Sequence, residues 1–207
     1  MANSRSYLTS TGAYDMAGNT IKIANREFRL VSGETFNPLE EVKGALKAIY
    51  TGVDMTFKQE YALESLWHEI RHAQAVGWKD LKKKTKLKSD TMETINQFCA
   101  RHSYSGFVKS LGGKTVHVKE IIEQGYGYGN YVSNFHSLLK HINVTQAEAH
   151  AHFKDIILKT PYEEIQMEIV KFVQAKGKYD IIQAYNIVEY MINKKTNVFV
   201  KYLQQMK

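Results

Sequence analysis

The stretch His68-Glu69-Ile70-Arg71-His72 places two histidines four residues apart, with a glutamate directly after the first of them. On an α-helix, residues i and i+4 lie one above the other on the same face, so both imidazoles can reach one metal ion. Glu69 lies about 100° further round such a helix. Its carboxylate can therefore reach a metal-bound water without being a ligand itself. The stretch predicts a metal site built on a single helix.

The residues around this stretch predict the helix that the site requires. Thr56-x-x-Gln59 has the pattern of a capping box, in which each side chain accepts a hydrogen bond from the other residue's backbone N–H. Gly77 is a typical residue just beyond a helix end. Between these signals, apolar residues recur at helical spacing: Leu63, Leu66, Trp67 and Ile70. We therefore expect both histidines to lie inside one helix.

A second helix is predicted to follow. A catalytic zinc ion needs three protein ligands and one open position for water. Asp90-x-x-Glu93 has the pattern of another capping box, and Gly112-Gly113 lies beyond the expected helix end. The apolar stripe of this helix consists of Ile95, Phe98 and Cys99. Glu93 lies in the first turn of this helix.

In this arrangement, roughly from residue 60 to residue 104, the chain resembles the gluzincin-type H-E-x-x-H zinc metallopeptidases. The metzincin pattern would require glycine at position 75 and histidine at position 78, where this chain has Ala75 and Trp78. The resemblance implies a zincin-like fold, Zn²⁺ held by His68, His72 and Glu93, and a peptide or protein substrate.

Two features leave the third ligand open. Gluzincins often carry an aspartate four residues after the ligand glutamate, where it orients a ligating histidine. Here that position is Gln97, which can accept an N–H but supplies no negative charge. Glu93 is also the predicted capping residue, and one carboxylate cannot easily cap a helix and bind zinc. His102 is the main competing ligand, and Glu120 and Glu123 are more distant ones.

The predicted chemistry is hydrolysis of a peptide or amide bond. Zinc lowers the pKa of its bound water to about 7 and polarises the substrate carbonyl. Glu69 is expected to accept the proton of that water and to pass it to the leaving amine. A hydrogen-bond donor should face the developing oxyanion. His102, Tyr104 and the tyrosines of the segment Gly125-Tyr-Gly-Tyr-Gly-Asn130 are the candidates.

Composition and charge restrict the setting. The chain has 207 residues, of which 43% are hydrophobic and 24% charged, as in globular proteins. A single cysteine, Cys99, excludes an internal disulfide, and its place on an apolar stripe favours core packing over a role as nucleophile. The N-terminus has no apolar signal region, and no eighteen apolar residues run together. We therefore expect a cytoplasmic protein with no membrane segment.

One short segment of the chain is rich in lysine and carries a concentrated positive charge. The net charge is +7, and lysines crowd into one short stretch at positions Lys79, Lys82, Lys83, Lys84, Lys86 and Lys88. Such a run can bind nucleic acid or an acidic partner. A solvated segment is the favoured interpretation, because no aromatic residues alternate with the lysines as they do in single-strand binders.

The expected fold class is α+β: a mainly helical zincin-like domain over residues 1–207 with a small N-terminal β-sheet. Residues 1–35 form the β element, with Ile21 and Ile23 in one strand, Phe28 and Leu30 in the next, and a hairpin turn at Asn25-Arg26. Residues 38–112 form the metal-binding core, and residues 113–207 a helical C-terminal part. Further helix starts are expected at Asn37-Pro38, Thr145-x-x-Glu148 and Thr160-Pro161, with a stop at Gly177. The glycine-rich segment is interpreted as a plain loop rather than a lid.

The alternative to a hydrolase is a non-catalytic binding or assembly protein that uses the basic run as its contact surface. In that case any metal would serve structure only. A short β region joined to an H-E-x-x-H helix also resembles zincin-like domains encoded by phages and mobile elements.

Overall fold

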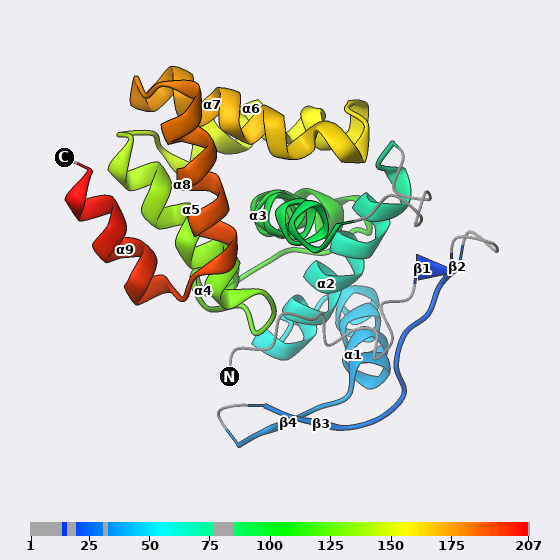
Figure 1. Cartoon of the computed structure of the whole chain (residues 1–207). Helices are drawn as coiled ribbons and strands as arrows, with labels where there is room; N and C mark the ends of the chain where they lie inside the picture. Colours follow the sequence, from blue (N-terminus) through cyan, green and yellow to red (C-terminus); the bar gives the residue numbers. More distant parts are fainter. Residues whose placement is uncertain (1–13, 16–19, 31–32, 77–84, 207) are drawn as a thin grey trace. The chain divides into compact units, whose positions relative to one another are not determined.

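The computed structural model describes residues 14–15, 20–30, 33–76 and 85–206 of the chain (Figure 1). The chain divides into two compact units, one made of residues 1–73 and 100–129 and the other of residues 74–99 and 130–207. The described helices are α1 (Pro38–Thr51), α2 (Phe57–Gln74), α3 (Lys86–Ser110), α4 (Val118–Gln124), α5 (Gly129–His141), α6 (Gln146–Lys159), α7 (Ile165–Gly177), α8 (Ile181–Asn193) and α9 (Thr196–Gln205), with a 3₁₀ turn at Tyr162–Glu164 before α7. Mainly helical structure with small strands confirms the coarse α+β prediction.

The N-terminal strands pair differently from the prediction. β1 (Tyr14–Asp15) pairs with β2 (Thr20–Ile21), and β3 (Phe28–Arg29) pairs with β4 (Thr35–Phe36), each antiparallel. The predicted hairpin between residues 21–23 and 28–30 is wrong because the chain turns at Gly33. The φ of Gly33 is +88°, a conformation that glycine adopts readily, and the Gly33 N–H donates a hydrogen bond to the Leu30 carbonyl. The segment before β3 instead lies along the start of α1, where Leu39 N–H donates to the Ala24 carbonyl.

Locally capped helices begin where the sequence predicts. The Asn37 side chain accepts the Glu40 N–H at the start of α1, with Pro38 as the first helical residue. Thr56 and Gln59 form both bonds of the predicted capping box before α2, at 3.3 and 3.0 Å. The Thr145 hydroxyl accepts the Glu148 N–H before α6.

Helix α3 begins earlier than predicted, and this changes the surroundings of Glu93. The cap is Thr85, whose hydroxyl accepts the Lys88 N–H at 3.3 Å, while Asp90 forms an ion pair with Lys86 at 2.9 Å. The predicted capping box at Asp90 and Glu93 is therefore wrong: two good capping residues lie close together, and the helix uses the earlier one. Glu93 then lies inside the helix, and its carboxylate is not needed as a cap.

This correction gives a stability prediction. Thr85→Ala removes the N-cap acceptor and is expected to lower the free energy of unfolding by about 1 kcal/mol. Asp90→Ala removes an ion pair whose lysine is exposed, and is expected to cost about 0–1 kcal/mol. Urea unfolding of both variants measures the difference. A larger loss in Asp90→Ala than in Thr85→Ala would contradict the observed helix start.

The first unit has its hydrophobic core between α1, α2, the C-terminal part of α3, and α4. Fully buried residues of this core include Phe36 from β4, and Ala45, Leu63, Tyr104, Val108 and Ile121 from the helices. Trp67 on α2 links the two long helices, because its indole N–H donates to the Ser103 hydroxyl at 2.8 Å and its ring stacks on Phe107. These contacts orient the helix that carries the H-E-x-x-H stretch.

The second unit is a helical bundle containing the N-terminal part of α3 and helices α5 to α9. Helix α8 packs on α7 and α9, and it lies beside α5, whose Asn134 side chain donates to the carbonyls of Met191 and Lys194 (Figure 1). Helix α7 ends at Gly177 as predicted, but it begins at Ile165, after the 3₁₀ turn, and not at Pro161. Asp180 and Gln183 form a full capping box at the start of α8.

Candidate metal centre

Helix α2 presents His68, Glu69 and His72 as the sequence predicts, inside a continuous helix. The two imidazole rings lie edge to face, with centroids 4.5 Å apart. His68 is 1% exposed, His72 2% and Glu69 6%. Burial of three adjacent polar side chains is costly unless they are paired or bind an ion. The burial shows that this turn of α2 is not a solvated helix face.

Among the described residues, Glu93 lies near enough to these histidines to form a group that could hold a metal ion. Ligand atoms of His68, His72 and Glu93 all lie within 4.8 Å of one another. Two imidazoles and one carboxylate form the His₂Glu donor set of catalytic zinc sites. Three such ligands at about 2.0–2.1 Å from a tetrahedral zinc lie about 3.3 Å apart. The donor set fits zinc.

The other predicted third ligands lie differently. His102 follows Glu93 by about two and a half turns of α3, which places it on the opposite side of that helix. The Glu120 carboxylate contacts the His117 ring at 2.7 Å, and Glu123 is exposed. Gln97 is buried one turn after Glu93, and its proposed role of orienting a histidine stays a prediction.

Tyr104, a predicted oxyanion donor, is fully buried, and its hydroxyl donates to the Glu60 carboxylate at 2.8 Å. Burial, followed by the bond to Glu60, raises the pKa of the Tyr104 hydroxyl far above its ordinary value. Tyr104 also lies about three turns beyond Glu93 on α3. Its catalytic role, like that of His102, stays a prediction that these contacts do not support.

Helix α4 is held at both ends by buried charges from neighbouring helices. At its start, the Glu60 carboxylate accepts the N–H groups of Val116 and His117 at 2.6 and 3.1 Å. At its end, the Arg101 guanidinium donates to the carbonyls of Ile122, Gly125 and Gly127 at 3.1, 2.9 and 2.7 Å. An anion at the N-terminus and a cation at the C-terminus both match the helix dipole.

Arg101 was missed at the sequence level, although a signal exists. It lies in phase with Phe98, Tyr104 and Val108, at a core position of α3, where a charged residue needs a specific partner. Burial lowers the pKa of the Arg101 guanidinium, and the charge of Glu64 opposes this shift. The glycine-rich segment after α4 is therefore anchored by a buried cation.

Tyr128 is one of the tyrosines that the sequence offers as oxyanion donors, but its stacking on His68 was not predicted. It belongs to the glycine-rich segment, and its ring stacks on the His68 imidazole with centroids 5.4 Å apart and planes 17° apart. The side chain is 7% exposed. The repeated glycines of Gly125-Tyr-Gly-Tyr-Gly129 are the signal that a special backbone path is needed here.

Arg71 points off the predicted metal-binding face, and the sequence predicts that it makes a surface ion pair. In the structure, however, Arg71 is 4% exposed, and its guanidinium lies over the Trp67 ring, 5.9 Å from the centroid. Helix α2 is buried on more sides than its sequence suggests. Cys99 is a buried free cysteine, as predicted.

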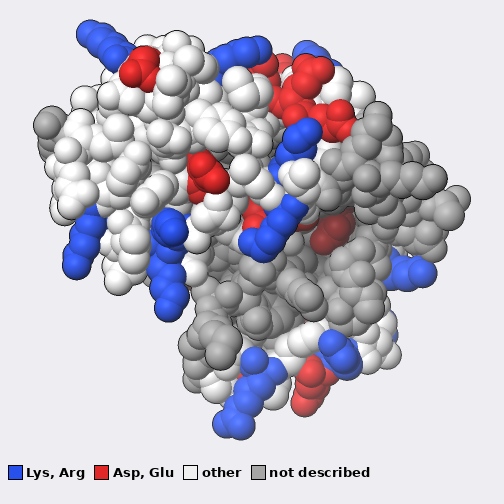
Figure 2. All heavy atoms as spheres, viewed as in Figure 1, with Lys and Arg blue, Asp and Glu red and all other residues white. Residues whose placement is uncertain are grey.

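In the basic run, four of the lysines lie outside the described residues: Lys79, Lys82, Lys83 and Lys84. On the face shown in Figure 2, the lysine and arginine side chains of the described residues are scattered among acidic ones. Nucleic-acid binding through Lys79–Lys88 stays a prediction.

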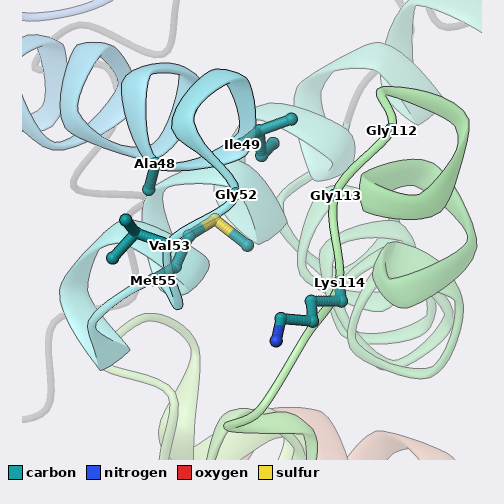
Figure 3. Close-up of a pocket in the computed structure, with 8 residues that line it drawn as sticks. All are labelled: Ala48, Ile49, Gly52, Val53, Met55, Gly112, Gly113 and Lys114. Atoms are coloured by element: carbon teal, nitrogen blue, oxygen red, sulfur yellow. The ribbon is translucent and has the colours of Figure 1, made fainter.

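Two cavities in the first unit lie apart from the H-E-x-x-H residues. One, of about 190 Å³, is formed where α1 and α3 end, at Gly52 and Gly112-Gly113, with Lys114 at its side (Figure 3). The other, of about 480 Å³, lies between the start of α2 and Tyr126, with Glu34 and Glu41 in its wall. Neither is lined by His68, Glu69 or His72.

Comparisons of the chain with models of protein families, with curated proteins and with solved structures found no match. Within the described residues, the helices are all too short or too polar to cross a membrane.

Proposed function

We propose that the chain is a zinc-dependent hydrolase of peptide or amide bonds. His68, His72 and Glu93 would hold the ion, and Glu69 would activate a water molecule. The observation that carries the proposal is the convergence of the two α2 histidines with the one glutamate that the gluzincin resemblance implies as third ligand. Glu69 also supports the proposal, because it directly follows His68 and could act as a general base without being a metal ligand itself.

The chemistry follows from the donor set and from Glu69. When bound, zinc acts as a Lewis acid and brings the pKa of its water to about 7. Glu69 would act as the general base that takes a proton from the attacking water, and then as the general acid that gives this proton to the leaving amine. The burial of this turn would limit the access of bulk water to charges that form there, and this would strengthen their electrostatic interactions.

Metal analysis tests the site directly. Purified wild-type protein is expected to contain about one zinc per chain, and His68→Ala and Glu93→Ala are expected to lose it. Glu123→Ala, the same change at an exposed glutamate, should retain it. His102→Ala separates the competing ligands, since it should also retain zinc. Elemental analysis after dialysis against a weak chelator provides the measurement, and metal-free wild-type protein after zinc loading would contradict the proposal.

A further inference from the structure

The backbone of Tyr128 is unusual for its position in the fold. Described non-glycine residues with positive φ occur at Tyr128, Asn143 and Lys178. Lys178 directly follows α7, and Asn143 lies two residues after the last residue of α5; a left-handed residue is common at such helix ends. Tyr128, with φ of +56°, instead precedes α5. A bulky residue keeps such a strained conformation only when its surroundings fix it, and such residues cluster at functional sites.

Two contacts fix this conformation from opposite sides. The Arg101 guanidinium bonds the carbonyls of Gly125 and Gly127, the latter directly before Tyr128. A Cβ atom at Gly125 would lie 2.7 Å from this guanidinium, so the backbone approaches Arg101 as closely as glycine allows. On the other side, the Tyr128 ring lies flat against the His68 imidazole. The strained residue thus joins an anchored backbone to a metal-site histidine.

We infer that Tyr128 and Arg101 are positioning residues of the metal site. Arg101 fixes the backbone of the glycine-rich segment between α4 and α5, and Tyr128 uses that backbone to hold the plane of the His68 ring. An imidazole binds a metal well only when its nitrogen lone pair points at the ion, so a group that fixes the ring plane raises affinity. This inference rests on the proposed metal site, and it gives the glycine-rich segment a role other than that of a plain loop.

The test compares zinc affinity in variants of the full chain. Tyr128→Leu removes the stacked ring and is expected to weaken zinc binding by about 10- to 100-fold, the range found when groups that orient metal ligands are lost. Tyr128→Phe keeps the ring and is expected to bind zinc within about threefold of wild type. Competition with a chromophoric chelator measures the dissociation constants. The visible spectrum of Co²⁺-loaded protein should change in Tyr128→Leu but not in Tyr128→Phe.

Tyr126→Leu is the matched control, because it removes a tyrosine of the same segment whose ring packs on Phe57 and Tyr61. It should leave zinc affinity and the Co²⁺ spectrum close to wild type. Arg101→Lys keeps the charge but loses the forked donor, and it should shift both readouts in the same direction as Tyr128→Leu. If Arg101→Lys does not fold, the tyrosine variants alone decide.

Two results separate this inference from the proposed function. If Tyr128→Leu binds zinc with an affinity within about threefold of wild type, the proposed role of Tyr128 is wrong, while the proposed metal site still stands. Equal weakening in Tyr126→Leu and Tyr128→Leu would also overturn it, because the effect would then reflect the whole segment. Lack of zinc binding in wild type would overturn the proposed function itself.

Discussion

Replacing Glu69 with glutamine is expected to leave zinc bound and to lower peptide hydrolysis by roughly 10²- to 10⁴-fold. Glutamine has nearly the same size as glutamate, and the ligands His68, His72 and Glu93 are unchanged, so the ion should remain. The amide cannot accept a proton from the attacking water, so the chemical step should slow. The measurement is cleavage of unfolded casein and of a quenched fluorescent peptide mixture, with zinc content determined on the same samples.

Glu123→Gln is the control for this variant, since it makes the same chemical change at an exposed residue and should hydrolyse like wild type. Equal activity in Glu69→Gln and wild type would exclude Glu69 as the base. A wild-type protein that holds zinc but cleaves none of these substrates would instead favour the alternative of a non-catalytic binding or assembly protein, with the metal serving structure.

Replacing Glu60 with alanine is expected to lower the free energy of unfolding by roughly 3 kcal/mol or more. The fully buried Glu60 carboxylate accepts three hydrogen bonds, from Tyr104 and from the N–H groups of Val116 and His117. Each bond to a charged group contributes about 1.5–3 kcal/mol, and the three donors would remain buried without an acceptor. Urea or thermal unfolding followed by circular dichroism measures the loss.

Graded variants show whether this loss comes from the hydrogen bonds. Glu60→Gln keeps one acceptor oxygen and should lose less stability than Glu60→Ala. Tyr104→Phe removes one donor and should cost about 1–3 kcal/mol. In the double variant Glu60→Gln/Tyr104→Phe the two losses should not add, because the residues share one bond. Strict additivity would show that the bond between Tyr104 and Glu60 contributes little.

Much of the helical structure could be predicted because its signals are local. Asn37, Thr56 and Thr145 each cap the helix directly after them, and a side chain three residues from its partner needs no knowledge of the fold. Prediction failed at α3, where Thr85 and Asp90 are both good caps and only the packed structure decides between them. The predicted pairing of the N-terminal strands was also wrong, because strands this short carry too little of a hydrophobic pattern to determine which strand they pair with.

The candidate site likewise combines residues that local spacing predicts with residues that only the folded chain brings together. The spacing of His68 and His72 predicts their proximity by helix geometry alone. The resemblance to gluzincins points to Glu93, and because α3 begins at Lys86 with Thr85 as its cap, Glu93 does not have to cap the helix. Arg101 and Tyr128 act through contacts between segments distant in sequence, and the left-handed backbone of Tyr128 runs against the preference of its residue type. Such contacts depend on tertiary structure and have no period in the sequence.

The two charges that hold α4 have one further consequence. Glu60 and Arg101 lie at opposite ends of this short helix, and the direction of the peptide groups determines which end takes which sign. Exchanging the two residues would preserve composition and net charge, yet each would then face backbone groups that repel it. The direction of the chain therefore requires the negative charge at the start of α4 and the positive charge at its end. Exchanging Glu60 and Arg101 would not restore the contacts that hold the helix.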